Sequence, residues 1–418
     1  MKRIGILALI LSATFASATW AQQNARMLPF GKRPLLRHRI VNGMPKAPRA
    51  VGNQGLAASA SAADSLRTWE LGTYPGGTWV GLGDINDFGV AVGFGDIADG
   101  STHTLAVPLF GPQAGKWIDL GTLGGTTAGW EWPINRISDT GVIVGHSPTT
   151  QGPTHGIVWT EKTGIVDLGS LADAGYPTHN SSYASGVNKL GTLLVGWSGV
   201  DDGYDQPVVW MRSIVSKGGA LVTKWEIRKL DTTGFEDVTQ WTPWQANDLG
   251  QIVGYGYRSE GGAISFLWTP LPGGKSWKIT TLGCGPDYAG CGAYNITDRG
   301  EIAGYVESSD WMPAYWKPLD PLRRTYSQAV VLALPAGYSA GGYADGINEL
   351  GDVTGACWGD AGSLAARWTT KDATFSQVIG SPTDSWSFSL GVSITRIAVL
   401  SYFGDNCPNG CARAVQIH

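Results

Sequence analysis

A segment of nine or ten residues recurs along this chain, and its spacing constrains the fold more than any other feature. The copies follow one another at intervals of about 50 residues, and they span residues 85–93, 137–145, 187–196, 246–254, 296–304 and 347–355. Each copy reads as the end of one strand, a turn that contains Gly, and a second strand such as VAVG. Repeats of this length are typical of solenoids and propellers, in which each unit packs against its neighbours.

Two further elements complete the repeated unit. One contains an aromatic position, which is occupied by Trp159, Trp210, Trp268, Trp316 and Trp368. The other ends in Leu-Gly or a similar pair, as in KWIDLGTLGG and GIVDLGSLA. The unit therefore predicts four short strands separated by turns, which is the pattern of a propeller blade. The Trp residues are expected to pack between sheets, and the tight turns are expected at Asn86, Asn188, Asn247 and Asn348.

The two ends of the array predict how a ring would close. An isolated copy of the fourth element lies at residues 68–77, and the last unit stops after its third strand. An N-terminal strand that completes the last blade would remove the exposed edges of an open array. We therefore predict an all-β fold, a propeller of about seven four-stranded antiparallel blades that is closed by an N-terminal strand.

The N-terminus predicts export. Lys2 and Arg3 precede an apolar stretch, and a small-residue pattern ends at Ala21. This order indicates a signal peptide over residues 1–21 and a secreted or periplasmic protein without membrane insertion. Residues 22–63 are basic and end in a low-complexity run, which predicts a disordered leader or linker. The propeller domain is expected over residues 64–418.

Charge is distributed unevenly along the chain. Residues 1–63 hold nine of the 30 Lys and Arg and none of the 34 Asp and Glu, so the remainder has 21 cations and a net charge of −13. A partner nucleic acid requires a basic face, because its phosphates dominate binding. The acidic body therefore argues against nucleic acid, and we expect a monomer.

The cysteines fit an oxidising compartment. We predict that Cys284 pairs with Cys291 and Cys407 with Cys411, because each pair closes a short local loop. This pairing leaves Cys357 without a disulfide partner. The spacing differs from that of metal sites and no His lies nearby, so no metal centre is expected.

The repeated motifs resemble those of the HAF family of extracellular bacterial repeat proteins. The resemblance rests on DLGTLGG, on the Ile-Asn-x-x-Gly turns and on the His-containing strands, in which His103 and His155 keep the family's His. It covers nearly all of residues 68–418 and implies export and a repetitive β fold. It implies no catalytic motif, and both His residues are expected to be structural because they occupy equivalent repeat positions.

The loops on one face of such a propeller are the default binding site. In this chain they are rich in aromatic residues, whose flat rings fit sugar rings, so we predict a polysaccharide or other glycan as partner. A Trp in such a loop can also cap the end of a sheet, and this alternative stays open. The predicted ligand-binding residues are Trp79, Trp130, Trp132, Trp241, Trp244, Tyr343 and Trp386.

A catalytic role at the same rim is an alternative. His146 and His179 have no counterparts in other units and are expected in rim loops near Tyr183. A His and a Tyr can serve as base and acid in β-elimination from a uronic acid, with Arg258 as the carboxylate ligand. A polysaccharide lyase, a glycoside hydrolase that uses rim carboxylates and a protein scaffold therefore remain open. No cofactor is expected, apart from a calcium-loop fragment at residues 201–205.

Overall fold

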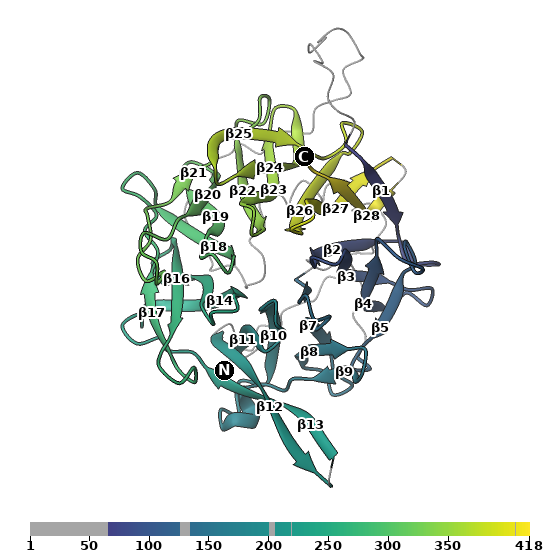
Figure 1. The fold of residues 1–418 in the computed structure, drawn as a ribbon, viewed down its shortest axis with the longest axis vertical. Coiled ribbons are helices and arrows are strands. Elements are labelled where there is room, and N and C mark those ends of the chain that lie inside the picture. Colours follow the sequence, from purple (N-terminus) through teal and green to yellow (C-terminus); the bar gives the residue numbers. More distant parts are fainter. Residues whose placement is uncertain (1–65, 126–133, 200–204, 219, 406) are drawn as a thin grey trace, which may run out of the picture.

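The chain forms a ring of seven sheets in the computed structural model, which describes residues 66–125, 134–199, 205–218, 220–405 and 407–418 (Figure 1). Each sheet has four antiparallel strands, and six of the sheets follow chain order. The first strand of each blade lies nearest the axis of the ring. The predicted all-β propeller of seven four-stranded blades is confirmed.

The strands are short and regular along the described chain. The first three blades consist of β2 (Val80–Ile85), β3 (Val90–Asp96), β4 (Thr102–Pro108) and β5 (Ile118–Gly121); β6 (Arg136–Ile137), β7 (Ile143–Pro148), β8 (Thr154–Thr160) and β9 (Gly164–Asp167); and β10 (Ser181–Val187), β11 (Leu193–Gly199), β12 (Gln206–Lys217) and β13 (Ala220–Lys229). A single 3₁₀ turn, η1 (Leu171–Ala174), precedes β10. The hairpin of β12 and β13 projects beyond the ring (Figure 1).

The remaining four blades repeat the same arrangement. They consist of β14 (Val238–Ala246), β15 (Ile252–Arg258), β16 (Ala263–Pro270) and β17 (Trp277–Thr281); β18 (Gly290–Ile296), β19 (Ile302–Glu307), β20 (Trp311–Trp316) and β21 (Val330–Val331); β22 (Gly341–Ile347), β23 (Asp352–Gly359), β24 (Gly362–Thr369) and β25 (Asp372–Val378); and β26 (Trp386–Val392), β27 (Ile397–Gly404), β28 (Cys407–Gln416) and β1 (Thr68–Gly72).

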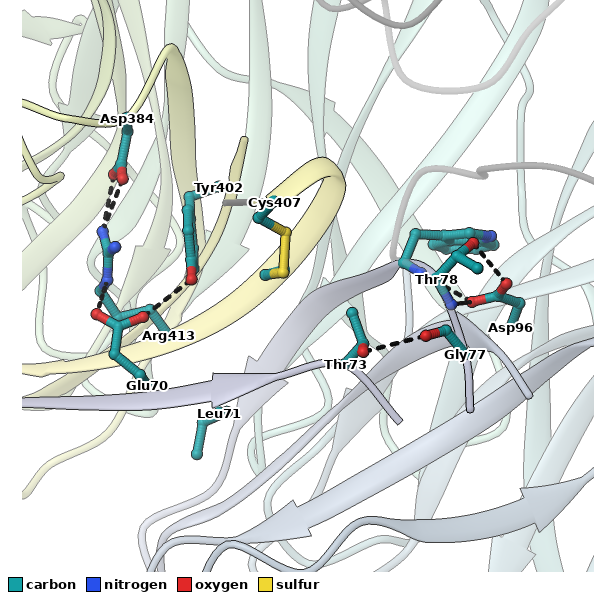
Figure 2. Close-up of a disulfide and its surroundings, with 12 residues drawn as sticks. Glu70, Leu71, Thr73, Gly77, Thr78, Asp96, Asp384, Tyr402, Cys407 and Arg413 are labelled. Atoms are coloured by element: carbon teal, nitrogen blue, oxygen red, sulfur yellow. Dashed lines mark hydrogen bonds and ion pairs between the residues drawn. A yellow bond between two sulfur atoms is a disulfide. The ribbon is translucent and has the colours of Figure 1, made fainter. Parts of the chain in front are cut away.

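Strand β1 closes the ring as the fourth strand of the seventh blade. It pairs antiparallel with β28, so that Trp69 lies opposite Ala414 and Glu70 opposite Arg413. Figure 2 shows the polar contacts of this closure, in which Glu70 accepts hydrogen bonds from Arg413 and from the hydroxyl of Tyr402. The predicted closure by an N-terminal strand is confirmed.

The antiparallel order places the loops on two faces. We call the upper face the one that carries the turns from second to third strands and the connections between blades. The lower face carries the turns from first to second strands, where the recurrent Asn residues lie. Asn86, for example, accepts hydrogen bonds from the backbone N–H groups of Phe88 and Val90. Asn86, Asn188, Asn247 and Asn348 all accept such bonds, so their predicted role in the turns is confirmed.

Hydrogen bonds between these turns form a continuous ring on the lower face. Each turn contacts the next, and side chains accept most of these bonds from the backbone of a neighbouring blade. The seven contacts are Ile394–Asp87, Asp87–Asp139, Asp139–Lys189, Leu190–Asp248, Asp248–Asp298, Asp298–Glu349 and Asn348–Ser393. The motif thus fixes both the hairpin within a blade and the contact between blades.

The recurrent Trp residues join adjacent blades as well. Trp210, Trp268, Trp316 and Trp368 are buried, whereas Trp159 is half-buried. Each of the four buried indoles donates its Nε1–H to a backbone carbonyl in the connection from the preceding blade, as Trp210 does to Leu168 at 2.9 Å. The expectation that the recurrent Trp residues belong to the core is confirmed for these four, and Trp159 packs on the core while half-buried.

Both predicted disulfides are present, Cys284–Cys291 and Cys407–Cys411, and Cys357 is a buried free thiol. Burial raises the pKa of the Cys357 thiol to about 12. Disulfides of this kind are typical of oxidising compartments. Among the described residues, no helix is long and apolar enough to cross a membrane. The predicted signal peptide and leader, residues 1–63, lie outside the described part of the chain.

Candidate functional site

Aromatic rings surround the axis of the propeller. Phe94, Trp197, Tyr255 and Tyr305 follow the Gly of the second strand in four blades, and His146 occupies the same position in the second blade. In the sixth and seventh blades Ala356 and Ser401 stand at this position, and the ring comes instead from the paired residue of the first strand, Tyr343 or Phe388. We call these seven rings the aromatic belt.

In five blades the ring of the belt faces a smaller residue on the paired strand. Tyr305 pairs across the strands with Gly292, where an added Cβ would lie 2.2 Å from the Tyr305 ring. The third blade is the exception, because Tyr183 and Trp197 both carry rings and stack 5.3 Å apart. The repeat therefore supplies one ring per blade at this level, and the third blade supplies a second one.

A buried ion pair crosses the axis beneath the belt. The guanidinium of Arg136 on β6 donates to Asp345 on β22 at 3.1 Å and to the carbonyl of Gly83 at 2.7 Å. Asp345 lies where the strand register shifts by one residue, and the same shift in β14 places Trp244 5.8 Å from the guanidinium. Arg136 thus connects the second blade with the first and the sixth.

Two carboxyl groups near Arg136 are strongly desolvated. Burial raises the pKa of Asp84 to about 6 and that of Asp345 to about 7, although the Arg136 charge opposes the shift in both. Asp84 also accepts hydrogen bonds from the backbone N–H groups of Ile85 and Ile137. These carboxyls therefore hold their protons more tightly in the folded protein than an ordinary Asp with a pKa of 3.8.

This difference predicts a pH dependence of stability. The folded state binds more protons than the unfolded state between pH 3.8 and about 7, so the free energy of unfolding is expected to fall as the pH rises through this range. Asp84→Asn removes one of these protonation sites and should flatten the decline. Urea unfolding at about pH 5 and about pH 8 measures it. The exposed Asp360→Asn is the control, and an equal slope in Asp84→Asn and wild type would contradict the assignment.

The structure brings two of the four predicted catalytic residues together. The ring of His146 lies 4.9 Å from Tyr183 and 4.9 Å from Phe94. His146 was predicted in a rim loop, but it lies on strand β7, where it is 4% exposed. No other blade carries a His at this position, but aromatic residues take it in four other blades. The sequence does contain a signal for this equivalence, because His146 follows the Gly of its second strand as Phe94 does in the first blade. It was missed because the two side chains differ.

The other two predicted catalytic residues, His179 and Arg258, belong to different parts of the ring, the first to the third blade and the second to the fourth. His179 lies in the connection before β10, with its ring 6.1 Å from Tyr176. Arg258 ends β15 in the fourth blade, where its Nη1 lies 2.6 Å from Asp237, and both side chains are 44% exposed. Arg258 is therefore engaged by an acid of its own blade.

Five of the seven predicted ligand-binding residues lie in the core rather than in open loops. Trp241 and Trp244 are on β14, Tyr343 is on β22, Trp386 begins β26 and Trp79 precedes β2; none is more than 9% exposed. For Trp241, Trp244, Tyr343 and Trp386 the placement in loops was wrong because the first strands begin earlier than expected, whereas Trp79 lies in the predicted loop but is buried. Trp130 and Trp132 lie outside the described residues, as do residues 201–204 of the calcium-loop fragment. The described residues contain no cluster that could hold a metal.

Two partly open aromatic residues of the upper face, Trp311 and Trp358, were not among the predicted ligand-binding residues. Trp311 begins β20 and stacks on the buried Tyr305 at 4.4 Å, with an interplanar angle of 26°. Trp358, near the end of β23, donates its Nε1–H to the Asp310 carboxylate of the neighbouring blade at 3.2 Å. We call Trp311, Trp358, Asp310 and Glu307 the tryptophan patch. The signal for it was a Trp beside the turn between second and third strands, directly after the turn at Trp311 and just before it at Trp358.

The tryptophan patch is held in place by packing around it. A Cβ at Gly341 would lie 2.7 Å from Trp358 Nε1 and 2.8 Å from the Trp311 carbonyl, so only Gly permits this approach. Glu307 is half-buried opposite Trp311 in the strand register and accepts the backbone N–H of Ala263 in the fourth blade, and burial raises the pKa of its carboxyl. The patch therefore combines two indoles of fixed orientation with two carboxyl groups, which can contact an apolar surface and accept hydrogen bonds from hydroxyl groups.

Comparisons with known proteins show no family. No family model matches the chain, and no curated protein matches it. Solved structures with a similar fold include an acylaminoacyl peptidase of Pyrococcus horikoshii (12% identity, 80% of this chain and 50% of that chain, TM-score 0.43), a Trypanosoma rangeli sialidase (11%, 85% and 60%, 0.45) and an ulvan lyase of polysaccharide lyase family PL25 (11%, 84% and 96%, 0.48). The chain spans about half the length of the peptidase.

Proposed function

We propose that this protein binds a glycan on its upper face, at the tryptophan patch. The observation that carries the proposal is the pair of partly open indoles, Trp311 and Trp358, beside the carboxyl groups of Asp310 and Glu307. The C–H faces of a sugar ring pack on flat aromatic surfaces, while its hydroxyl groups donate to carboxylates. Because Tyr305 and Asp310 already hold the indoles, little side-chain entropy is lost on binding.

The proposal includes an extracytoplasmic setting. The two disulfides, Cys284–Cys291 and Cys407–Cys411, support an oxidising compartment. The sequence motifs support export and membership of the HAF repeat family. Sequencing the N-terminus of the protein recovered from culture medium tests export.

Trp311→Ala is expected to weaken glycan binding about tenfold, because loss of one buried-edge aromatic contact costs roughly 1.4 kcal/mol. Affinity electrophoresis in gels that contain soluble neutral or acidic polysaccharides measures the change. The control is Phe88→Ala, which removes an aromatic ring that is 71% exposed on the lower face. Equal retention of wild type and Trp311→Ala on every retained polysaccharide would rule out the tryptophan patch.

A second candidate function is lyase activity, and the contact of His146 with Tyr183 at 4.9 Å favours it. In β-elimination a base removes the proton beside the carboxylate of a uronic acid, and an acid protonates the departing glycosidic oxygen, which leaves an unsaturated sugar. The proposed base and acid are drawn from His146, His179 and Tyr183.

His146→Ala is expected to abolish the ultraviolet absorbance of an unsaturated product if the protein is a lyase. The control is His103→Ala, because His103 pairs with Asp119 at 2.7 Å in the first blade and has a structural role. Reducing ends are assayed in parallel, and their release without absorbance would indicate a hydrolase instead. Full turnover in His146→Ala would eliminate the assignment of His146.

A further inference from the structure

A hollow of about 370 Å³ lies on the side of the ring between the third and fourth blades. One wall is the end of β13 and the residues that follow it, and the other wall is the turn before β17. Its lining side chains are Arg228, Lys229, Asp231, Thr232, Thr233, Lys275, Ser276 and Trp277. The lining contains three basic side chains and one acidic side chain, so its net charge is positive, whereas residues 64–418 together carry a net charge of −13.

The walls of this hollow are anchored to the blades. The backbone N–H of Leu230 donates to the Pro207 carbonyl, and the indole of Trp268 donates to the Asp231 carbonyl. On the opposite wall, Trp277 is 6% exposed and donates to the carbonyl of Gly250 at 2.7 Å. The cations are therefore carried by segments that are fixed at their backbones.

One carboxylate of the lining, Asp231, offsets part of the positive charge of the hollow. Asp231 accepts both the backbone N–H and the hydroxyl of Thr233, and these bonds lower the pKa of its carboxyl. Arg228 lies 3.5 Å from Glu226, but both side chains are about 40% exposed, so this pair contributes little. Within the described part of the chain, Lys229 and Lys275 form no ion pair.

The repeat itself shows that this charge is specific to the third blade. Lys229 pairs with Val208 in the strand register, and the corresponding residues of the first two blades are Asp119 and Asp167. Those two acids pair with His103 and His155. The same backbone position thus carries an acid in two blades and a base in the third.

We propose that this hollow binds an anionic group, a carboxylate or a sulfate ester, of an acidic polysaccharide. Lys229 and Lys275 supply charge from opposite walls, Arg228 supplies guanidinium donors, and the hydroxyl of Ser276 supplies a further hydrogen bond. The inference rests on the proposed function, since it makes the hollow a second contact for the glycan. It narrows the ligand to a polysaccharide with charged groups.

The test is affinity electrophoresis of the full mature chain in polygalacturonate, in dextran sulfate and in neutral dextran, each at fixed ionic strength. We expect the double variant Lys229→Ala with Lys275→Ala to bind the anionic polymers at least about tenfold more weakly, with unchanged mobility in dextran. The control double variant, Lys162→Ala with Lys371→Ala, removes the same charge from exposed sites and should change binding less than about twofold. Loss on polygalacturonate alone assigns a carboxylate, and loss on dextran sulfate alone assigns a sulfate ester.

Two results would overturn this inference. The first is unchanged binding of the Lys229 and Lys275 double variant, and the second is an equal loss in the control, which would indicate a general effect of net charge. Trp311→Ala is run on the same gels. If Trp311→Ala binds as wild type does while the lysine double variant binds the anionic polymers more weakly, the hollow is supported and the tryptophan patch is contradicted. If Trp311→Ala binds more weakly while the lysine double variant binds as wild type does, only the hollow is contradicted.

Discussion

A chain that begins at Thr73 is expected to lose its cooperative fold, whereas a chain that begins at Leu66 should unfold as the full chain does. The shorter chain lacks β1, so Trp69 and Leu71 no longer cover the apolar core of the first and seventh blades. It also leaves Arg413, which is 8% exposed, without Glu70. Because a domain is stable by only about 5–15 kcal/mol, loss of a whole strand and an open β28 edge is expected to remove most of that margin.

Thermal unfolding followed by circular dichroism measures this prediction. The truncation leaves the residues of the Arg413–Asp384 contact, 2.8 Å in the intact protein, and of the Cys407–Cys411 disulfide in the chain, and Figure 2 shows both beside the closing strand. If the chain that begins at Thr73 unfolded at the same temperature as the one that begins at Leu66, β1 would not be the element that closes the ring.

Arg136→Met is expected to destabilise the protein by about 3–5 kcal/mol, because it leaves a buried carboxyl group without its partner. Arg136 is fully buried and contacts both Asp345 and the Gly83 carbonyl, so one substitution removes contacts between three blades. Urea unfolding at neutral pH measures the change. The control is Arg258→Ala, whose exposed pair with Asp237 should be worth about 0–1 kcal/mol.

A double variant separates the ion pair from simple loss of volume. If the cost of Arg136→Met arises from the stranded Asp345, then Arg136→Met with Asp345→Leu should recover much of the stability, since an apolar pair can replace a buried ion pair. A double variant less stable than Arg136→Met alone would show that packing, not charge, is lost.

The architecture was predictable because its determinants are local and repeated. The turn at Asn86 and the hydrogen bond from Trp210 to a backbone carbonyl of the preceding connection recur in other blades, so one unit predicts the next. The surplus strand at residues 68–77 and the missing strand at the C-terminus predicted the closure between β1 and β28. A few neighbouring residues are enough to determine a tight turn or an aromatic core position.

The candidate site was less predictable because it depends on the register of strands. Trp244 was expected in a loop, but a shift of one residue within β14 directs it toward the axis beside Arg136. The partners of Arg136 come from β2 and β22, which lie far away in the sequence. Which Trp stays open also depends on the strand beside it, because Gly341 on β22 leaves room for both Trp358 of its own blade and the Trp311 carbonyl of the preceding blade. Such contacts leave no periodic pattern in the sequence.

Hydroxyl-radical footprinting of the wild-type protein, with and without a polysaccharide that it retains, tests the central claim most directly. Oxidation of each aromatic side chain is read by mass spectrometry. The account predicts that the glycan protects Trp311 and Trp358, while Phe88 on the lower face is oxidised equally in both samples. Protection confined to other residues, with Trp311 and Trp358 oxidised as in the free protein, would contradict binding at the tryptophan patch.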